Sequence, residues 1–355
     1  MATQPPYPLH ESIRDLLDPE YASFYKQYLL HAPQVHHQPV AASRVGGKLI
    51  PGGTDPLIVG KTIDVRIPRL ESTGPSVNVR VFIPPGAPSS PEGWPVFLWY
   101  HGGGWVLGNI DSENSLCTNL CARASCVVIT TDYRLAPENP FPAAVHDAWE
   151  TVLWVVSGAA EAHLRPYLGL SEGVSGGGGG LDLNKLAIGG SSAGGNLAAV
   201  MTHKAIGHSI FLEKGIAFAY QILVVPVTVN TASVSTNATY AAYEHTPALP
   251  AEKMLWYRRH YLPNETDWSD KLASPLLASD ETFARLPRAL VVVAGLDVLR
   301  WEGEEYARRL DGAGVQAEVV VVEGVPHPFL VMDAVLKKGR NAVSLLCERL
   351  AEAFE

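Results

Sequence analysis

The chain has 355 residues, of which 47% are hydrophobic and 18% charged, so it can bury a large core and is not intrinsically disordered. A formal net charge of −9, without a cluster of Lys and Arg, argues against a nucleic-acid partner. Four cysteines do not make a disulfide scaffold, no apolar run reaches the roughly 18 residues of a membrane span, and no signal peptide is recognisable, so we expect a cytoplasmic protein.

Residues 1–45 are expected to form N-terminal cap helices followed by a linker. Apolar residues recur at spacings of three and four between Ser12 and Leu30, which predicts one or two amphipathic helices. The Pro- and His-rich segment 31–40 is typical of an extended linker. Its pair His36-His37 has no evident partner for a metal, so we interpret the pair as part of a polar loop and expect no metal site.

The main domain, residues 46–355, has the pattern of an α/β fold. Segments 62–67 and 77–83 alternate apolar and polar residues, which is typical of half-exposed antiparallel strands. The apolar runs that follow predict strands covered on both faces, at 96–100, 127–130, 186–188, 222–225, 290–293 and 319–322. Helices are expected between them, at about 115–124, 143–156, 193–206, 302–313 and 332–353. Together these elements predict a mostly parallel sheet of about eight strands flanked by helices.

Two segments interrupt this alternation. Residues 171–180 are glycine-rich and lack the pattern of a phosphate-binding loop, so we expect a flexible surface loop. Residues 227–275 lie between two predicted strands and are too long for a plain connection. We expect this segment to be a cap insertion that forms a helical lid together with the N-terminal helices.

A candidate nucleophile follows the apolar run 186–188. The sequence Gly190-Ser191-Ser192-Ala193-Gly194 has the G-x-S-x-G pattern of a nucleophile elbow and leads into a predicted helix. Ser192 is the central residue, because a register centred on Ser191 would put Ala193 in the place of the closing glycine. Taken alone, the pattern is also compatible with an ordinary glycine-rich turn.

A second motif, His101-Gly102-Gly103-Gly104-Trp105, directly follows another buried strand. Successive glycines expose main-chain N–H groups, which are the donors that stabilise a tetrahedral intermediate. We expect the N–H groups of Gly103, Gly104 and Ala193 to form an oxyanion hole. The alternative is a flexible turn, and we interpret His101 as a residue that holds the loop.

The candidate acid and base follow the next predicted strands. Asp297 comes after the run 290–293, and His327 comes after the run 319–322. Strand ends of this kind meet at one edge of a parallel sheet, and the order Ser192, Asp297, His327 is that of α/β hydrolases. Each residue has a structural alternative: Asp297 as a helix N-cap and His327 as a loop histidine between prolines. Glu302 and Glu304 are alternatives for the acid.

The motifs together resemble the hormone-sensitive-lipase-like carboxylesterase family of the α/β-hydrolase fold. The further matching segments are 132–138 (DYRLAPE), 141–144 (FPAA), 274–275, 295–299 and 324–329. The resemblance implies that Ser192, Asp297 and His327 form a catalytic triad, with Gly103, Gly104 and Ala193 as oxyanion donors. The Gly-Gly-Trp and ENPFPAA sequences resemble fungal members. The chain departs from the family at Ser191, where Asp or Thr is usual, at Trp301, where an Asp often follows the acid, and in a long insertion at 158–181.

The predicted function is a serine carboxylic-ester hydrolase. It would cleave short-chain acyl esters of small molecules through an acyl-enzyme intermediate, without a cofactor or metal. Trp105 and Trp256 are candidates for the substrate pocket. The same triad would serve an arylamide or lactone hydrolase or a deacetylase, and a non-catalytic, hormone-receptor-like binding module is an alternative of another class. The resemblance also allows a homodimer through the strand near 319–322 or the last helix.

Overall fold

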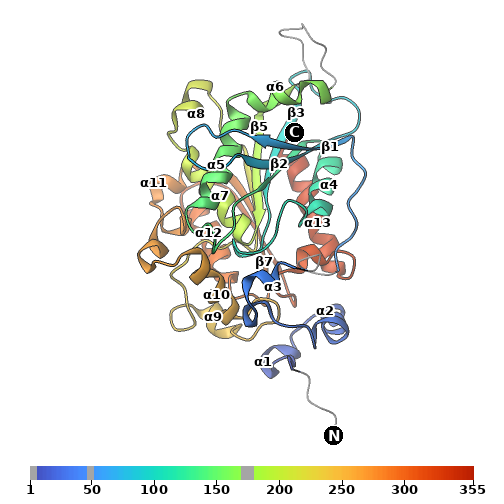
Figure 1. Cartoon of the computed structure of the whole chain (residues 1–355), viewed down its shortest axis with the longest axis vertical. Helices are drawn as coiled ribbons and strands as arrows, with labels where there is room; N and C mark the ends of the chain where they lie inside the picture. Colours follow the sequence, from blue (N-terminus) through green and yellow to red (C-terminus); the bar gives the residue numbers. More distant parts are fainter. Residues whose placement is uncertain (1–5, 46–51, 169–179) are drawn as a thin grey trace.

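A computed structural model describes residues 6–45, 52–168 and 180–355 of the chain. An eight-stranded sheet lies at its centre (Figure 1). The strands are β1 (Lys61–Ile67), β2 (Val77–Ile83), β3 (Trp94–Tyr100), β4 (Val127–Asp132), β5 (Leu181–Ser191), β6 (Tyr220–Val224), β7 (Arg288–Ala294) and β8 (Ala317–Val322). Each predicted strand is present, so the α/β-hydrolase fold expected from the sequence is confirmed.

The strand order is β1-β2-β4-β3-β5-β6-β7-β8. β1 pairs with β2 and β2 with β4 in antiparallel fashion, whereas every pair from β4 to β8 is parallel. The carboxyl ends of β3, β5, β7 and β8 therefore meet at one edge of the sheet. These are the four strands that precede the motifs singled out in the sequence.

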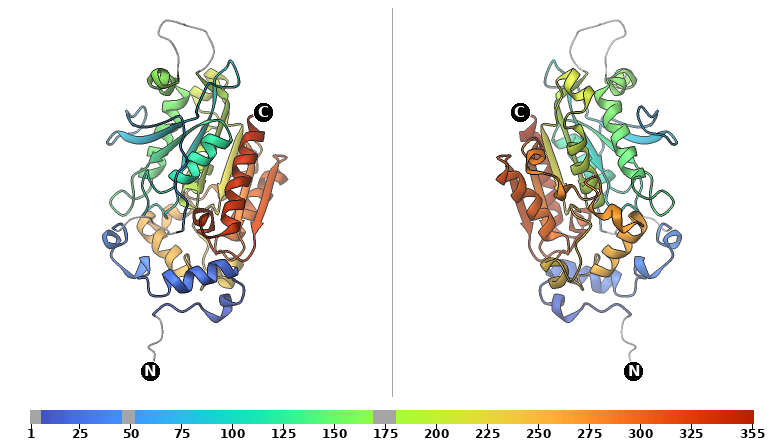
Figure 2. Two further views of the ribbon diagram at one scale, coloured as in Figure 1. Left: turned by 90° about the vertical axis from the view of Figure 1, so that its right-hand side faces the viewer. Right: turned by 90° about the vertical axis from the view of Figure 1, so that its left-hand side faces the viewer.

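Helices cover both faces of the sheet (Figure 2). The larger ones are α4 (Asn114–Arg123), α5 (Ala143–Val156), α7 (Ala193–Ala205), α12 (Arg300–Gly312) and α13 (Lys337–Ala353), and shorter ones are α6 (Ala159–Leu164), α8 (Ser209–Lys214) and α11 (Asp280–Phe283). No helix within the described ranges is both long and apolar enough to cross a bilayer.

The apolar strands contribute side chains to two hydrophobic cores, because successive side chains of a strand point to opposite faces of the sheet. In β3, Leu98 belongs to the core that includes residues of α5 and α7, while Phe97 and Trp99 belong to the core that includes residues of α4 and α13. Both cores need apolar side chains. This explains why the central strands read as continuous apolar runs rather than as alternating patterns.

Three details of the prediction for the main domain are wrong. The apolar run in β8 is not covered on both faces: the strand is partly exposed, with Val319 40% accessible, because β8 is the last strand of the sheet. β2 is mostly buried rather than half-exposed, because α4 and α5 both pack against it. The last helix begins at Lys337 instead of 332, after the short 3-10 helix η6 (Phe329–Met332).

The N-terminal residues form α1 (Glu11–Arg14), α2 (Pro19–Phe24) and the π-helix η1 (Tyr25–Leu29), as the helical spacing predicts. Segment 31–40 is not an extended linker. It contains the 3-10 helix η2 (Val35–His37) and the start of α3 (Val40–Ser43), because Val35 and Val40 pack against the larger core.

Segment 227–275 contains α9 (Ala238–Ala242), α10 (Ala251–Tyr261) and the 3-10 helix η4 (Glu265–Ser269). In Figures 1 and 2 these helices lie at the same end of the molecule as the N-terminal helices. The glycine-rich loop expected at 171–180 falls outside the described residues, apart from Gly180.

Candidate active site

Ser192 lies in the sharp turn between β5 and α7. Its backbone has φ 54° and ψ −116°, a conformation that is strained for a residue with a side chain. The turn is held by hydrogen bonds from the Ser192 N–H to the carbonyl of Val224 (2.8 Å) and from the Asn196 N–H to the carbonyl of Ser192 (3.0 Å). These hydrogen bonds hold the strained backbone conformation in place, and this conformation directs the hydroxyl to the edge of the sheet.

The glycines around Ser192 are required by close backbone approaches. A Cβ at Gly190 would overlap the carbonyl of Gly194, and a Cβ at Gly194 would overlap the carbonyl of Tyr100 on the neighbouring strand. Any larger residue would force β5, α7 and β3 apart. The small residues of the G-x-S-x-G pattern are thus a packing requirement of this turn.

The loops after β7 and β8 bring Asp297 and His327 to Ser192. His327 Nε2 lies 2.8 Å from Ser192 Oγ, and His327 Nδ1 lies 2.7 Å from Asp297 Oδ2. The Asp297 side chain is 1% exposed, and its other carboxylate oxygen accepts the N–H of Leu299 at 3.0 Å. The carboxylate is therefore fixed at both oxygens. The same group orients the imidazole. Asp297 is not the N-cap of α12, as the structural alternative expected, because that position is held by Leu299.

The two alternatives considered for the acid have other partners. Glu302 is buried and accepts the N–H groups of Thr228 (2.6 Å) and Val229 (2.9 Å). Glu304 pairs with Arg300 at 2.9 Å. Neither carboxylate bonds His327 in the described structure, so the geometry favours Asp297.

The glycine loop after β3 has left-handed backbone at Gly103 (φ 122°) and Gly104 (φ 60°). A Cβ at Gly103 would overlap the carbonyl of Leu107. Within the described residues, the N–H groups of Gly103, Gly104 and Ala193 donate to no protein acceptor. Three free amides next to Ser192 are suited to hold a negatively charged oxygen.

His101 holds this loop from within. Its ring is buried, stacks on Tyr133 with 4.3 Å between centroids, and lies 2.7 Å from the carbonyl of Gly102 through Nδ1. The hydroxyl of Tyr133 donates to the carbonyl of His101 at 2.8 Å. Burial lowers the pKa of His101, so the ring is neutral at neutral pH. This environment agrees with the supporting role expected for His101.

Glu113, at the N-terminal end of α4, was missed by sequence reasoning. Its Oε1 accepts Ser191 Oγ (2.6 Å) and the Gly102 N–H (3.1 Å), and its Oε2 accepts Trp99 Nε1 (2.6 Å). One carboxylate thus joins the nucleophile turn to the glycine loop. The sequence carried one signal for it: the serine at 191, where the family usually has Asp or Thr, needs its hydrogen-bond partner from elsewhere.

Comparison with known proteins identifies the family of this chain. Residues 97–331 match a protein family whose description is "alpha/beta hydrolase fold". The chain is 46% identical to an AB hydrolase superfamily protein of Schizosaccharomyces pombe (94% of this chain, 93% of the relative) and 33% identical to an arylesterase of Saccharolobus solfataricus (88% and 92%). The chain belongs to the hormone-sensitive-lipase-like carboxylesterase family. The structure of a thermostable esterase from Pseudomonas putida superimposes with a TM-score of 0.77 at 27% identity, covering 96% of this chain and 98% of that one.

In this carboxylic ester hydrolase, Trp105 and Trp256, which were expected to line the substrate pocket, lie in different surroundings. Trp105 is fully buried and stacks on Tyr261, with 4.2 Å between ring centroids. Trp256 is half-buried and packs edge-on against Tyr257 and His260. The ring that touches the glycine loop is that of Tyr257, because a Cβ at Gly104 would overlap it.

Proposed function

We propose that the chain hydrolyses short-chain acyl esters of small molecules through an acyl-enzyme intermediate on Ser192. The observation that carries this proposal is the continuous chain of contacts from Asp297 through His327 to Ser192, at 2.7 and 2.8 Å. A serine hydroxyl is a weak nucleophile at neutral pH and needs an adjacent base, which is what His327 provides here.

The proposed reaction begins when Ser192 Oγ attacks the ester carbonyl carbon and His327 Nε2 takes the hydroxyl proton. The imidazolium then protonates the departing alcohol, which leaves the acyl group bonded to Ser192. A water molecule attacks this acyl-enzyme with His327 again as the base, and the carboxylic acid leaves. Asp297 holds the tautomer with the proton on Nδ1 and stabilises the imidazolium.

The oxyanion formed in each step is proposed to accept hydrogen bonds from the N–H groups of Gly103, Gly104 and Ala193. The absence of acceptors for these groups within the described chain supports this assignment. Each such donor accelerates acyl transfer by roughly 10²–10³-fold.

We propose that residues 6–45 and 227–275 together form a cap over Ser192. The N-terminal part meets the loop of His327, where the Asp18 N–H donates to the carbonyl of Gly324 at 2.7 Å. The other part contributes α10, which packs against η2 and carries Tyr257 over Gly104. Ser192 itself is only 9% exposed. A covered, aromatic-lined serine favours small acyl groups over long chains, and the name of the related arylesterase supports aryl esters as substrates.

The proposal is tested with p-nitrophenyl acetate. Ser192→Ala is expected to abolish turnover. The neighbouring Ser191→Ala, its comparison variant, removes the hydroxyl bonded to Glu113 and should lower turnover by no more than about tenfold. Intact-mass spectrometry after rapid acid quench should detect one acetyl group on the wild type and none on Ser192→Ala. Full activity of the Ser192→Ala variant would refute the proposal.

A second comparison identifies the acid. Asp297→Asn keeps the shape of the side chain but allows the wrong tautomer of His327, and about a 10⁴-fold loss of kcat is expected. Glu302→Gln is the control at another buried carboxyl close to Asp297, and its kcat should fall by less than about tenfold. A larger loss of kcat in Glu302→Gln than in Asp297→Asn would identify Glu302 as the acid instead.

Arylamides and lactones are alternative substrates of the same machinery. Side-by-side turnover of phenyl acetate, acetanilide and a simple lactone distinguishes these classes, and we expect the ester to be fastest because its leaving group needs the least protonation. A binding module without catalysis would leave all three unchanged, and the contact between His327 and Ser192 argues against it.

A further inference from the structure

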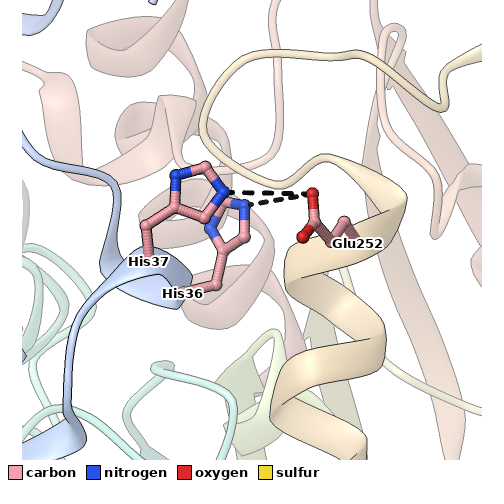
Figure 3. Close-up of side chains that lie close together, drawn as sticks. All are labelled: His36, His37 and Glu252. Carbon is pink, nitrogen blue, oxygen red and sulfur yellow. Dashed lines mark ion pairs between the residues drawn. The ribbon is translucent and has the colours of Figure 1, made fainter.

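The fold brings a carboxylate to the His36-His37 pair, for which the sequence showed no partner. Both histidines lie on η2, and Glu252 projects toward them from the first turn of α10 (Figure 3). Glu252 Oε2 lies 3.7 Å from His36 Nε2 and 4.0 Å from His37 Nε2. One donor atom from each of the three side chains falls within 4.8 Å of the others.

His36 is an unusual histidine. Its side chain is only 4% exposed, and its Nδ1 is buried without a hydrogen-bond partner in the described chain. Within the same described residues, the contact with Glu252 at 3.7 Å is the one polar contact of Nε2. Nε2 is therefore available to bind an ion, and an imidazole nitrogen is a common metal ligand.

We propose that His36, His37 and Glu252 bind a Zn²⁺ ion. Two imidazoles and one carboxylate form a donor set suited to zinc, which takes a water molecule as fourth ligand in open sites. Bonds of about 2.0 Å in a tetrahedron place neighbouring donor atoms about 3.3 Å apart. The distances of 3.7 and 4.0 Å are close to this value.

The donor atoms must move slightly closer together to bind the ion, and this movement can be made by the two exposed ligands. The side chains of His37 and Glu252 are 45% and 70% exposed, so they rotate without disturbing the core while His36 stays in place. The ammonium of Lys253 is the nearby opposing charge. It donates to the carbonyl of Ala248 at 2.7 Å.

A bound ion would cross-link two distant parts of the chain. η2 belongs to the N-terminal segment and α10 to segment 227–275, and apart from their packing the only polar contacts described between these two helices are those of Glu252. Because the ion binds only the folded arrangement, it should raise the thermal midpoint of the whole protein.

The test uses tag-free, full-length protein stripped of metal with a chelator. Zinc chloride is titrated by calorimetry, and thermal midpoints are recorded with and without zinc. For the wild type we expect one ion per chain and a higher midpoint with zinc. His37→Ala and Glu252→Gln should each weaken binding by at least about tenfold and remove most of the midpoint shift.

Two matched variants control for adventitious binding. His31→Ala removes an exposed histidine of the same segment, and Glu265→Gln an exposed carboxylate of the cap; both should bind zinc like the wild type. The metal-free midpoints of all four variants should match the wild type, because the changed side chains are exposed. No zinc uptake by the wild type, or equal uptake by His37→Ala and Glu252→Gln, would overturn the proposal.

Discussion

Glu113 Oε1 lies 2.6 Å from the hydroxyl of Ser191, the residue directly before Ser192. The same oxygen accepts the Gly102 N–H at 3.1 Å. The nucleophile turn and the glycine loop come from different strands, β5 and β3, and this carboxylate is a side-chain link between them. Glu113 is therefore a positioning residue for the proposed reaction: it touches no reacting atom but fixes the distance between Ser192 and the oxyanion donors.

Glu113→Gln should lower kcat by about tenfold, or about 1.4 kcal/mol, with KM changed less than about twofold. A Gln amide has one acceptor oxygen, so either Trp99 or the pair of Gly102 and Ser191 loses its acceptor. Steady-state kinetics with p-nitrophenyl acetate measures the split between kcat and KM. Glu265→Gln, at an exposed site, serves as control, and unchanged kcat in Glu113→Gln would contradict the positioning role.

Ser191→Asp should be harmful in this chain, although Asp is usual there in the family. The new carboxylate would face that of Glu113 at hydrogen-bond distance, and two like charges in a half-buried site repel. We expect a loss of about 1–3 kcal/mol in the free energy of unfolding. Adding Glu113→Gln should recover at least about half of it. Urea denaturation of the wild type, both single variants and the double variant measures this coupling; strictly additive effects would disprove it.

Tyr257→Ala should extend the range of acyl chains. Tyr257 covers Gly104, so its removal opens space beside the proposed oxyanion hole. We expect the ratio of kcat/KM for p-nitrophenyl octanoate to that for the acetate to rise about tenfold or more. The ratio is independent of how much of the variant is folded, which matters because deletion of a buried ring costs about 3–5 kcal/mol. Trp256→Ala, the neighbouring ring on α10, is the matched control and should leave the ratio within about twofold of the wild type.

His203 should make the protein acid-sensitive. Burial, and secondarily the charge of Arg309, lowers its pKa to about 3, while the unfolded chain has the ordinary value near 6.5. Below pH 6.5 the unfolded state binds a proton that the folded state does not. Stability is therefore lost as pH falls from about 6.5 toward 3, by up to about 1.4 kcal/mol per pH unit.

His203→Gln removes this titration and keeps a hydrogen-bonding group near the hydroxyl of Tyr306, which lies 3.0 Å from His203 Nε2. Urea midpoints at pH 7.5, 6, 5 and 4 should fall less steeply for the variant than for the wild type. Identical slopes would show that His203 does not carry the pH dependence.

The sequence was a sufficient guide wherever a feature depends on neighbouring residues. Two alternating segments and six apolar runs together predicted all eight strands, and the glycines around Ser192 predicted the turn, because packing and backbone geometry act locally there. Asp297 and His327 were singled out by their places after strands, since parallel strands bring their carboxyl ends to one edge. The exposure of β8 was not predictable in this way, because an apolar run does not state whether its strand is central or last.

Only the tertiary structure determined which side chains meet across the fold. Glu113 reaches Ser191, 78 positions along the chain, Tyr257 covers Gly104, and Glu252 faces His36. No local pattern identifies the partner in such pairs: Ser191 signals only that its hydroxyl needs an acceptor, and the other residues are ordinary polar or aromatic ones. Their geometry arises when helices and loops dock on the sheet, so it becomes definite only once the whole chain has folded.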